Sequence, residues 1–187
     1  NKKTKSVLAK IAELDFINDF YLAGGTALAI QLGHRASIDL DFFSIKKFSV
    51  QSLKSQLSRA GNLAVDYEDE DTLNGMLDEV KISFFHYGYD QIFNWTGYEG
   101  RFLASERDIA AMKIDTISSR GSKKDFVDVY FLLKKYSLDQ LFGARRAAGD
   151  VDVDGDDLVH ALDDGVVVED AARRGASAHR DDPCRRG

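Results

Sequence analysis

Apolar residues recur along the first 142 residues at two spacings, that of amphipathic helices and that of half-buried strands. Val7 and Ile11 illustrate the helical spacing, whereas Leu63, Val65 and Tyr67 alternate as in a strand. The elements predicted in the N-terminal half are a helix over 4–19, a strand over 20–23, a helix over 27–32 capped by Thr26, a strand over 37–43 and a helix over 50–60 capped by Ser49.

The second half of this region begins with a predicted hairpin. Asn74-Gly75 is a typical two-residue turn signal, because type I′ turns need positive φ at both central residues. The returning strand is predicted over 76–86, and residues 87–104 are expected to be irregular. Ser105 and Ser122, each followed three residues later by an aspartate, predict the starts of two further helices.

This order of elements predicts an α/β (α+β) fold, a mixed β-sheet flanked by helices with a helical C-terminal half. Composition divides the chain after Phe142. Residues 1–142 hold every lysine and every aromatic side chain, whereas residues 143–187 hold neither. We therefore expect one folded domain over 1–142 and a weakly ordered or single-helix tail over 143–187.

The bulk properties of the chain narrow the possible classes of protein. It has 187 residues, a formal net charge of -6 and one cysteine, Cys184, so an intrachain disulfide is excluded. The acidic balance does not favour a broad nucleic-acid surface, although local basic patches remain compatible with it. No apolar run is long enough to span a bilayer, and no signal-peptide pattern follows the basic start. We expect a cytoplasmic protein.

Candidate chemistry begins where the first predicted strand meets the second helix. Gly24 and Gly25 form the turn between them, and glycine lets the backbone approach a ligand closely. The free N–H groups and the dipole of a helix start favour a phosphate. The sequence therefore predicts a phosphate site at Gly24, Gly25 and Thr26.

Two carboxylates follow on the next predicted strand. Asp39 and Asp41 are two residues apart, so both project from one face, which Ser37 shares, whereas Ile38 points to the core. Paired carboxylates repel, and Mg²⁺ commonly binds one or two carboxylates together with substrate phosphates. A lone Gly-Gly or Asp-x-Asp would be a weak signal. Their close succession, with His34-Arg35 between them, favours a nucleotide-and-metal site.

A second group of charges lies near the predicted C-terminal helices. Lys113 and Arg120 are seven residues apart and share a helix face, and Lys124 and Asp128 are four apart on the next helix. Taken alone, this spacing favours an ordinary surface salt-bridge network.

Gly24-Gly-Thr-Ala-Leu-Ala29 followed by His34-Arg-Ala-Ser-Ile-Asp-Leu-Asp-Phe-Phe43 resembles the signature of the AbiEii/AbiGii-type nucleotidyltransferase toxins. These belong to the DNA polymerase β-like nucleotidyltransferase superfamily. The stretches 113–120 and 124–128 resemble the later motif of that family. The resemblance covers residues 1–142.

The resemblance implies an Mg²⁺-dependent enzyme that transfers a nucleotide from a nucleoside triphosphate to an acceptor such as RNA. It also implies a toxin of a bacterial toxin–antitoxin or phage-resistance pair, with a separate antitoxin as partner. The residue roles that follow from the resemblance and the motifs are catalysis by Asp39, Asp41, Lys113 and Asp128, metal binding by Asp39 and Asp41, and nucleotide binding by Gly24, Gly25, Thr26, Arg35, Ser37 and Arg120.

One position departs from the superfamily pattern. Related enzymes carry a third acidic residue on a neighbouring strand, and the best-placed residue here is Ser83. Serine is a poor ligand for a divalent cation. The alternative function is therefore a catalytically weakened nucleotide-binding module of the same fold.

Overall fold

The computed structural model describes residues 2–88, 94–98, 101–119 and 121–141. Its centre is a seven-stranded mixed sheet of order β3-β4-β5-β2-β1-β7-β6. The strands are β1 (Tyr21–Ala23), β2 (Leu40–Ser44), β3 (Leu63–Glu68), β4 (Thr72–Leu77), β5 (Val80–His86), β6 (Thr96–Tyr98) and β7 (Arg101–Leu103). The helices are α1 (Lys2–Ala12), the 3-10 helix η1 (Asp15–Asp19), α2 (Gly24–Leu32), α3 (Val50–Ala60), α4 (Glu106–Ser119) and α5 (Lys123–Leu133). The expected fold class is confirmed.

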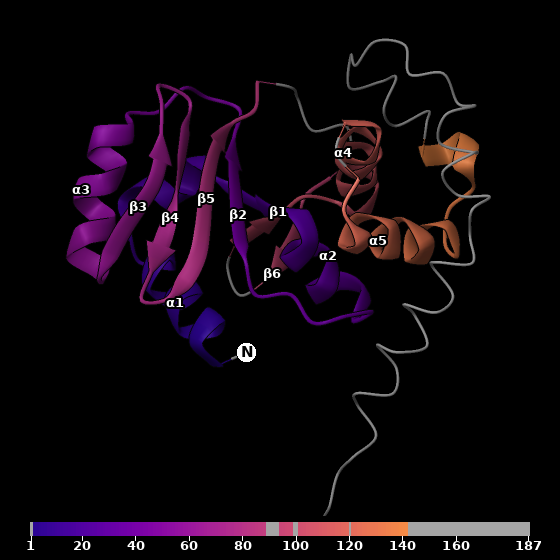
Figure 1. Ribbon diagram of the computed structural model, residues 1–187, viewed down its shortest axis with the longest axis horizontal. Coiled ribbons are helices and arrows are strands. Elements are labelled where there is room, and N and C mark those ends of the chain that lie inside the picture. Colours follow the sequence, from indigo (N-terminus) through magenta and orange to yellow (C-terminus); the bar gives the residue numbers. More distant parts are fainter. Residues whose placement is uncertain (1, 89–93, 99–100, 120, 142–187) are drawn as a thin grey trace, which may run out of the picture.

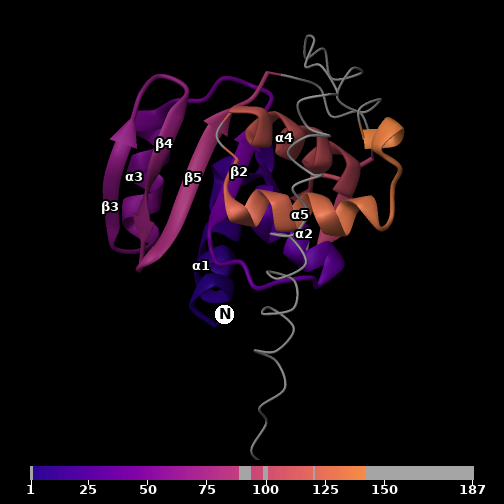
Figure 2. The ribbon, with the colours of Figure 1, turned by 45° about the vertical axis from the view of Figure 1, so that its right-hand side comes forward.

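The helices form two groups around the sheet. Figure 1 shows α1 and α3 on the side of the β3–β4–β5 strands, and α2, α4 and α5 grouped at the other side. Turning the molecule brings α5 across α2 and α4 (Figure 2), and these three helices contact one another. The sheet is mixed because β2 runs antiparallel to β1 but parallel to β5.

One part of the core lies between the sheet and the α1–α3 side, and the same buried cluster continues through residues of α2, α4 and α5. Phe42 of β2 and Phe84 of β5 stack with ring centroids 4.9 Å apart, and both are almost fully buried. Phe16 and Phe20 meet the Phe84 ring edge-on, so the segment around η1 closes this side of the sheet. Aromatic pairs of this kind stabilise a core beyond the area that they bury.

Several helix boundaries follow the sequence signals. The Ser49 hydroxyl accepts a hydrogen bond from the Ser52 N–H and begins α3, as expected. Ser105 accepts from the Asp108 N–H at the start of α4, and Ser122 with Asp125 forms a capping box on α5. The helix expected over 4–19 is wrong in its second half, because α1 ends at Ala12 and η1 follows.

The predicted hairpin turn is wrong. Asn74 and Gly75 lie inside β4, and the two-residue turn between β4 and β5 is Asp78-Glu79, with φ of 48° and 65°. Gly75 has another purpose. A Cβ atom there would lie 2.4 Å from the Ala64 carbonyl oxygen, beside the irregularity in β3. The glycine therefore admits a close backbone approach instead of making a turn.

The expectation for residues 87–104 is wrong in part. Within this stretch β6 and β7 pair antiparallel, and β7 adds to the sheet parallel to β1 through Leu22 and Leu103. These strands are three residues each, and the aromatic and glycine-rich composition concealed them. The tail over 143–187 lies outside the described residues, so the domain division stays a prediction.

Candidate active site

The turn between β1 and α2 packs directly against the carboxylate of Asp41. Gly24 has φ of 64°, a conformation that glycine adopts without a steric penalty. A Cβ atom at Gly24 would lie 2.6 Å from Asp41 Oδ2. The glycine is therefore required both by the backbone and by the carboxylate that occupies the space above it.

Gly25 has a different neighbour. A Cβ atom there would lie 2.2 Å from a terminal nitrogen of Arg35. The start of α2 is thus overlaid by one anionic and one cationic side chain. Its N–H groups still form the positive end of a helix dipole at this place.

Thr26 does not have the helix-capping role that the sequence suggested. It does not cap α2, whose N-cap is Ala23 with no side-chain hydrogen bond. The Thr26 hydroxyl contacts the Asp39 carbonyl oxygen and lies 2.9 Å from Ser37 Oγ, and the residue is buried. Thr26 therefore ties α2 to the segment before β2.

The two carboxylates lie at the start of β2. Leu40 and Phe42 are buried on the core side, as expected, but Ile38 is 50% exposed because the strand begins only at Leu40. On the other side, Asp41 is in register with Ser83 of β5 and Ala23 of β1. The Ser83 hydroxyl hydrogen-bonds to the Asp41 carboxylate.

The environment of Asp41 disfavours its charge. Burial raises the pKa of the Asp41 carboxyl, and the adjacent charge of Asp39 raises it further. The hydrogen bond from Ser83 and the positive charges of Lys113 and Lys81 oppose this rise without cancelling it. A cation between the carboxylates would remove the repulsion.

Asp128 joins the α2–β2 loop to α4 and α5. Its side chain is fully buried and accepts hydrogen bonds from Arg35 Nε at 2.6 Å and Arg35 Nη2 at 2.8 Å. Lys113 Nζ lies 3.0 Å from Asp128 Oδ2, and His34 Nε2 lies 2.7 Å from Asp128 Oδ1. Lys113 also donates to Asp125 at 2.6 Å.

The charge of Asp128 is strongly favoured. Burial alone would raise its pKa, but hydrogen bonds from Arg35 and His34 and the charge of Lys113 outweigh burial and hold the pKa well below its ordinary value. The pKa of Asp125 is also lowered, because hydrogen bonds from Lys113 and Ser122 outweigh its burial. Both carboxylates are therefore anionic partners for the surrounding cations.

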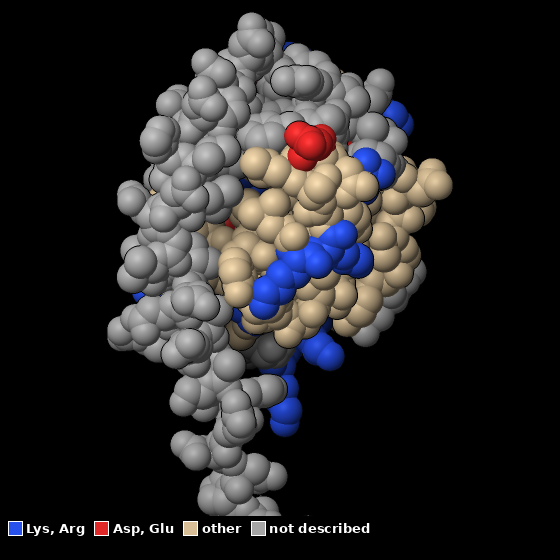
Figure 3. Space-filling model, turned by 90° about the vertical axis from the view of Figure 1, so that its right-hand side faces the viewer, with Lys and Arg blue, Asp and Glu red and all other residues tan. Residues whose placement is uncertain are grey.

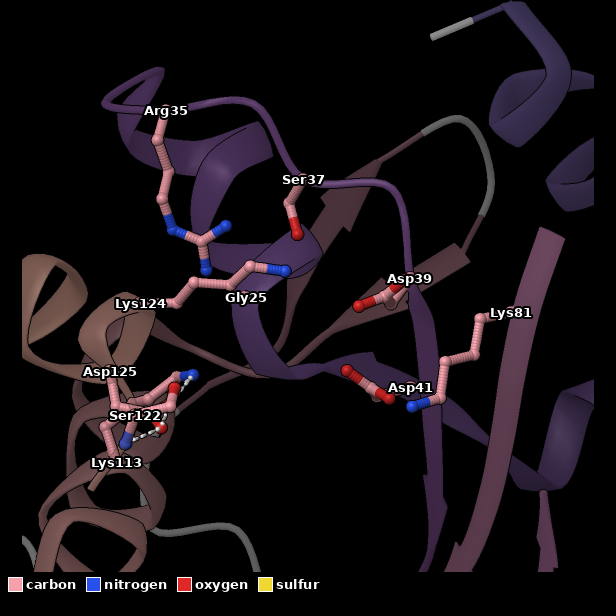
Figure 4. A pocket seen from close by; sticks show the side chains of 10 residues that line it. All are labelled: Gly25, Arg35, Ser37, Asp39, Asp41, Lys81, Lys113, Ser122, Lys124 and Asp125. Carbon is pink, nitrogen blue, oxygen red and sulfur yellow. Dashed lines mark hydrogen bonds and ion pairs between the residues drawn. The ribbon is translucent and has the colours of Figure 1, made fainter. Parts of the chain in front are cut away.

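A cavity of about 320 Å³, here called the basic cavity, opens among these residues. Figure 4 shows residues from the start of α2, the segment between α2 and β2, β2, β5, α4 and the start of α5 around it. The lining residues are Gly25, Arg35, Ser37, Asp39, Asp41, Lys81, Lys113, Ser122, Lys124 and Asp125. A second cavity of about 660 Å³ shares Gly25, Asp41, Lys81 and Lys113 with it and is also lined by Gly24. It is here called the aromatic cavity, because its lining includes Phe43, Tyr67, Phe85 and Tyr87.

Most of the expected site residues meet at these cavities. Asp128 and Thr26 do not line either of them; both lie beneath the site and contact residues that do. Arg120 lies outside the described residues. Lys81 was not foreseen, although it precedes Ser83 by two residues and strand alternation places it on the same face. Lys124 enters the cavity from the first turn of α5.

The residues present fit a divalent cation that is completed by a substrate. Asp39 and Asp41 direct their carboxylates into one cavity (Figure 4). Across the described residues, no group of three or more His, Cys, Asp or Glu side chains forms a metal site. Two carboxylates with substrate phosphates are the usual protein environment of Mg²⁺.

The sheet topology and the glycine turn beside paired carboxylates place this chain in the nucleotidyltransferase fold class. Residues 6–103 match the family described as "Nucleotidyl transferase AbiEii toxin, Type IV TA system". An uncharacterized protein of Aquifex aeolicus (strain VF5) is 44% identical over 142 residues, which are 74% of this chain and 69% of that protein. The chain belongs to the AbiEii family of nucleotidyltransferase toxins of type IV toxin–antitoxin systems.

Solved structures support the fold. JHP933 from Helicobacter pylori superposes with a TM-score of 0.55 at 21% identity, over 72% of this chain and 65% of that one. The nucleotidyltransferase toxin MenT4 from Mycobacterium tuberculosis H37Rv superposes with a TM-score of 0.51 at 14% identity, over 78% of this chain and 60% of that one. The chain thus spans less than two thirds of either structure. None of the helices in the described part of the chain has the length and apolar character needed to cross a bilayer.

Proposed function

We propose that this protein transfers a nucleotide from a nucleoside triphosphate to an acceptor hydroxyl, with release of pyrophosphate. The observation that carries the proposal is the shared cavity of Asp39, Asp41, Gly25 and Lys113. Anionic ligands for a cation, a helix start and a lysine thus face one space. A triphosphate with its metal needs all three.

The cations of the basic cavity hold the triphosphate in this proposal. Lys113, Arg35 and Lys124 come from three different elements and converge on one space, so their charges act together on a compact polyanion. Ser37 and the Gly24-Gly25 backbone supply neutral hydrogen-bonding groups. Asp39 and Asp41 would hold Mg²⁺, which when bound neutralises triphosphate charge and supports the attacking and leaving oxygens.

In this proposal Asp128 positions other side chains. The sequence had suggested instead that it lies near the metal or the nucleophile. It is fully buried and binds Arg35 through both carboxylate oxygens. It also lies 3.0 Å from Lys113 Nζ. Its charge therefore fixes two of the cations that face the triphosphate. Thr26 acts similarly on Asp39, and a nucleotide contact by Arg120 rests on the family resemblance.

RNA is the proposed acceptor, and an antitoxin protein the proposed partner. Figure 3 shows a band of lysine and arginine side chains on the helical side of the molecule, despite the net charge of -6. Lys123 and Lys134 are exposed at the two ends of α5. A local basic surface of this kind suits a phosphate backbone.

Ser83 favours the second candidate, a module that binds nucleotide with little turnover. It is in register with Asp41 and supplies a hydroxyl where a third carboxylate would complete the metal ligands. Binding and transfer must therefore be measured separately.

The test combines purified protein, Mg²⁺, α-labelled nucleoside triphosphates and total RNA. We expect label in RNA with the wild-type chain and a loss of at least about 100-fold with Asp41→Asn, which keeps shape but removes charge. Asp139→Asn is the matched control, because Asp139 is exposed and lines neither cavity. Nucleotide binding without any labelled product would support the weakened module. Equal transfer by both variants would overturn the site.

A further inference from the structure

The aromatic cavity lies directly beyond the proposed triphosphate site. Asp39, just before β2, lines the basic cavity alone, whereas on β2 Asp41 lines both cavities and Phe43 lines the aromatic cavity alone. On β5, Lys81 lines both cavities and Phe85 lines the aromatic cavity alone. Alternation keeps these side chains on one face of the sheet, so the two cavities follow each other along the strands.

Four aromatic side chains line this cavity, Phe43, Tyr67, Phe85 and Tyr87, and the Tyr21 ring stacks on Phe43 beside it. Phe43, Phe85 and Tyr87 form one contiguous group. Phe43 and Phe85 are cross-strand neighbours with ring centroids 5.2 Å apart, and the Tyr87 ring meets Phe43 edge-on at 6.0 Å. All three are only partly buried, unlike Phe42 and Phe84 on the other face. Met112 of α4, a different element from the strands that carry the rings, also lines the cavity. A flat aromatic ligand in the cavity would have both π-surface and a thioether to contact.

We infer that the aromatic cavity binds the nucleoside of the incoming nucleoside triphosphate, with the base stacked on Phe43 and Phe85. The inference rests on the proposed function, because it uses the triphosphate position to place the nucleoside. Lys113 and Lys81, shared by both cavities, lie at the junction where the α-phosphate joins the ribose. Base–aromatic stacking supplies affinity to any base, because every base has a π-face.

The charges at the far end of the cavity favour a nucleoside over an RNA strand. Among the lining residues the two lysines lie at the junction, whereas Asp66 on β3 carries a negative charge at the outer wall. Asp66 also begins an acidic segment that runs to Asp71. A nucleoside has no charge to be repelled there, whereas a phosphate backbone does.

Asn74 gives the cavity a means to recognise the base edge. It is in register with Ser83 and therefore lies in the same cross-strand row as Asp41. It lines the cavity, and within the described part of the chain its side chain makes no hydrogen bond, so its amide has both donors and an acceptor to offer. Asn74 is thus the side chain best placed to distinguish one base from another.

Two equilibrium titrations test the inference on the full chain. We expect the wild type to bind a non-hydrolysable nucleoside triphosphate at least about fivefold more tightly than inorganic tripolyphosphate, the difference that one base stack supplies. Phe43→Leu and Phe85→Leu should each reduce that advantage at least about fivefold and leave tripolyphosphate affinity unchanged. Phe102→Leu, which removes an exposed ring that lines neither cavity, is the matched control and should change neither.

The outcomes separate this inference from the proposed function. Failure of the wild type to bind either ligand would overturn both. Equal affinity for tripolyphosphate and the nucleotide, or full nucleotide affinity in both leucine variants, would overturn the nucleoside site alone. Retained nucleotide affinity with reduced RNA affinity in the same variants would also overturn it, and would assign the cavity to the acceptor. A melting curve for each variant shows that it is folded.

Discussion

β2 and β5 each carry two adjacent phenylalanines. The two faces of this strand pair differ in how far their phenylalanines are buried. On one face Phe42 and Phe84 stack in the core and are almost inaccessible. On the other face Phe43 and Phe85 remain partly exposed beside Asp41. Since the residue type is the same, the difference comes from what covers each face. The segment around η1 closes the first face, whereas cavities open on the second.

Among these four phenylalanines, those on one face serve stability and those on the other face are available for ligand binding. The core face contributes burial and ring packing to the free energy of folding. The cavity face keeps polar and aromatic groups in partial contact with water, which a functional surface needs. Substitutions on the two faces should therefore have different consequences.

The largest expected effect distinguishes Phe84 from Phe85. We expect Phe84→Ala to lower the free energy of unfolding by about 3–5 kcal/mol, because it leaves a cavity among the rings of the core. Phe85→Ala should cost about 1 kcal/mol, because its ring is only partly buried. Urea denaturation measures both. A similar loss of unfolding free energy from the two substitutions would show that both faces contribute equally to stability.

Asp128 provides the next test. We expect Asp128→Asn to lower the free energy of unfolding by about 3 kcal/mol, because Arg35 and Lys113 lose their buried counter-charge. Nucleotide affinity should fall as well, because both cations lose their fixed positions. Asp139→Asn is the control. A variant that kept full stability and affinity would show that Asp128 does not position these cations.

Acid should weaken the same network. The pKa values of Asp125 and Asp128 are lowered in the folded protein, so their contribution is present above their ordinary pKa of 3.8 and is lost as the pH falls below it. We expect the melting temperature to fall as the pH drops below about 4, and to fall less steeply in Asp128→Asn. Parallel pH profiles for wild type and variant would contradict this assignment.

The smallest expected effect concerns the tail. We expect deletion of residues 143–187 to change the free energy of unfolding by less than about 0.5 kcal/mol, because the segment contains no aromatic residue and only two leucines. Nucleotide affinity should be unchanged. Thermal melts and titrations of the shortened chain measure both. A large loss in either would show that the tail belongs to the folded domain.

The sequence predicted those parts of the fold that local chemistry determines. Serine caps located the starts of α3, α4 and α5, and strand alternation placed Asp41 opposite Phe42. The turn at Asn74-Gly75 was wrong, because a glycine can equally serve a close approach between strands. Only the tertiary contact with Ala64 distinguishes these two uses.

The candidate site shows the same limit. The motifs identified most of the residues that meet at the basic cavity, including Asp39 and Lys113. Whether the remaining motif residues reach the cavity depends on their burial. Asp128 and Thr26 have the side chains expected of ligand-binding residues, yet they contact neighbouring protein groups beneath the site. Sequence spacing carries no information about which of two polar groups is covered.

The central claim is that the Asp39–Asp41 pair holds a cation together with the triphosphate. Its most direct test is the affinity for a non-hydrolysable nucleoside triphosphate with and without Mg²⁺. We expect Mg²⁺ to raise the affinity of the wild type at least about tenfold, and to leave Asp41→Asn nearly unchanged. Without Mg²⁺, the variant should bind at least as tightly as wild type, because one repelling charge is gone. An equal gain from Mg²⁺ in both proteins would contradict the claim.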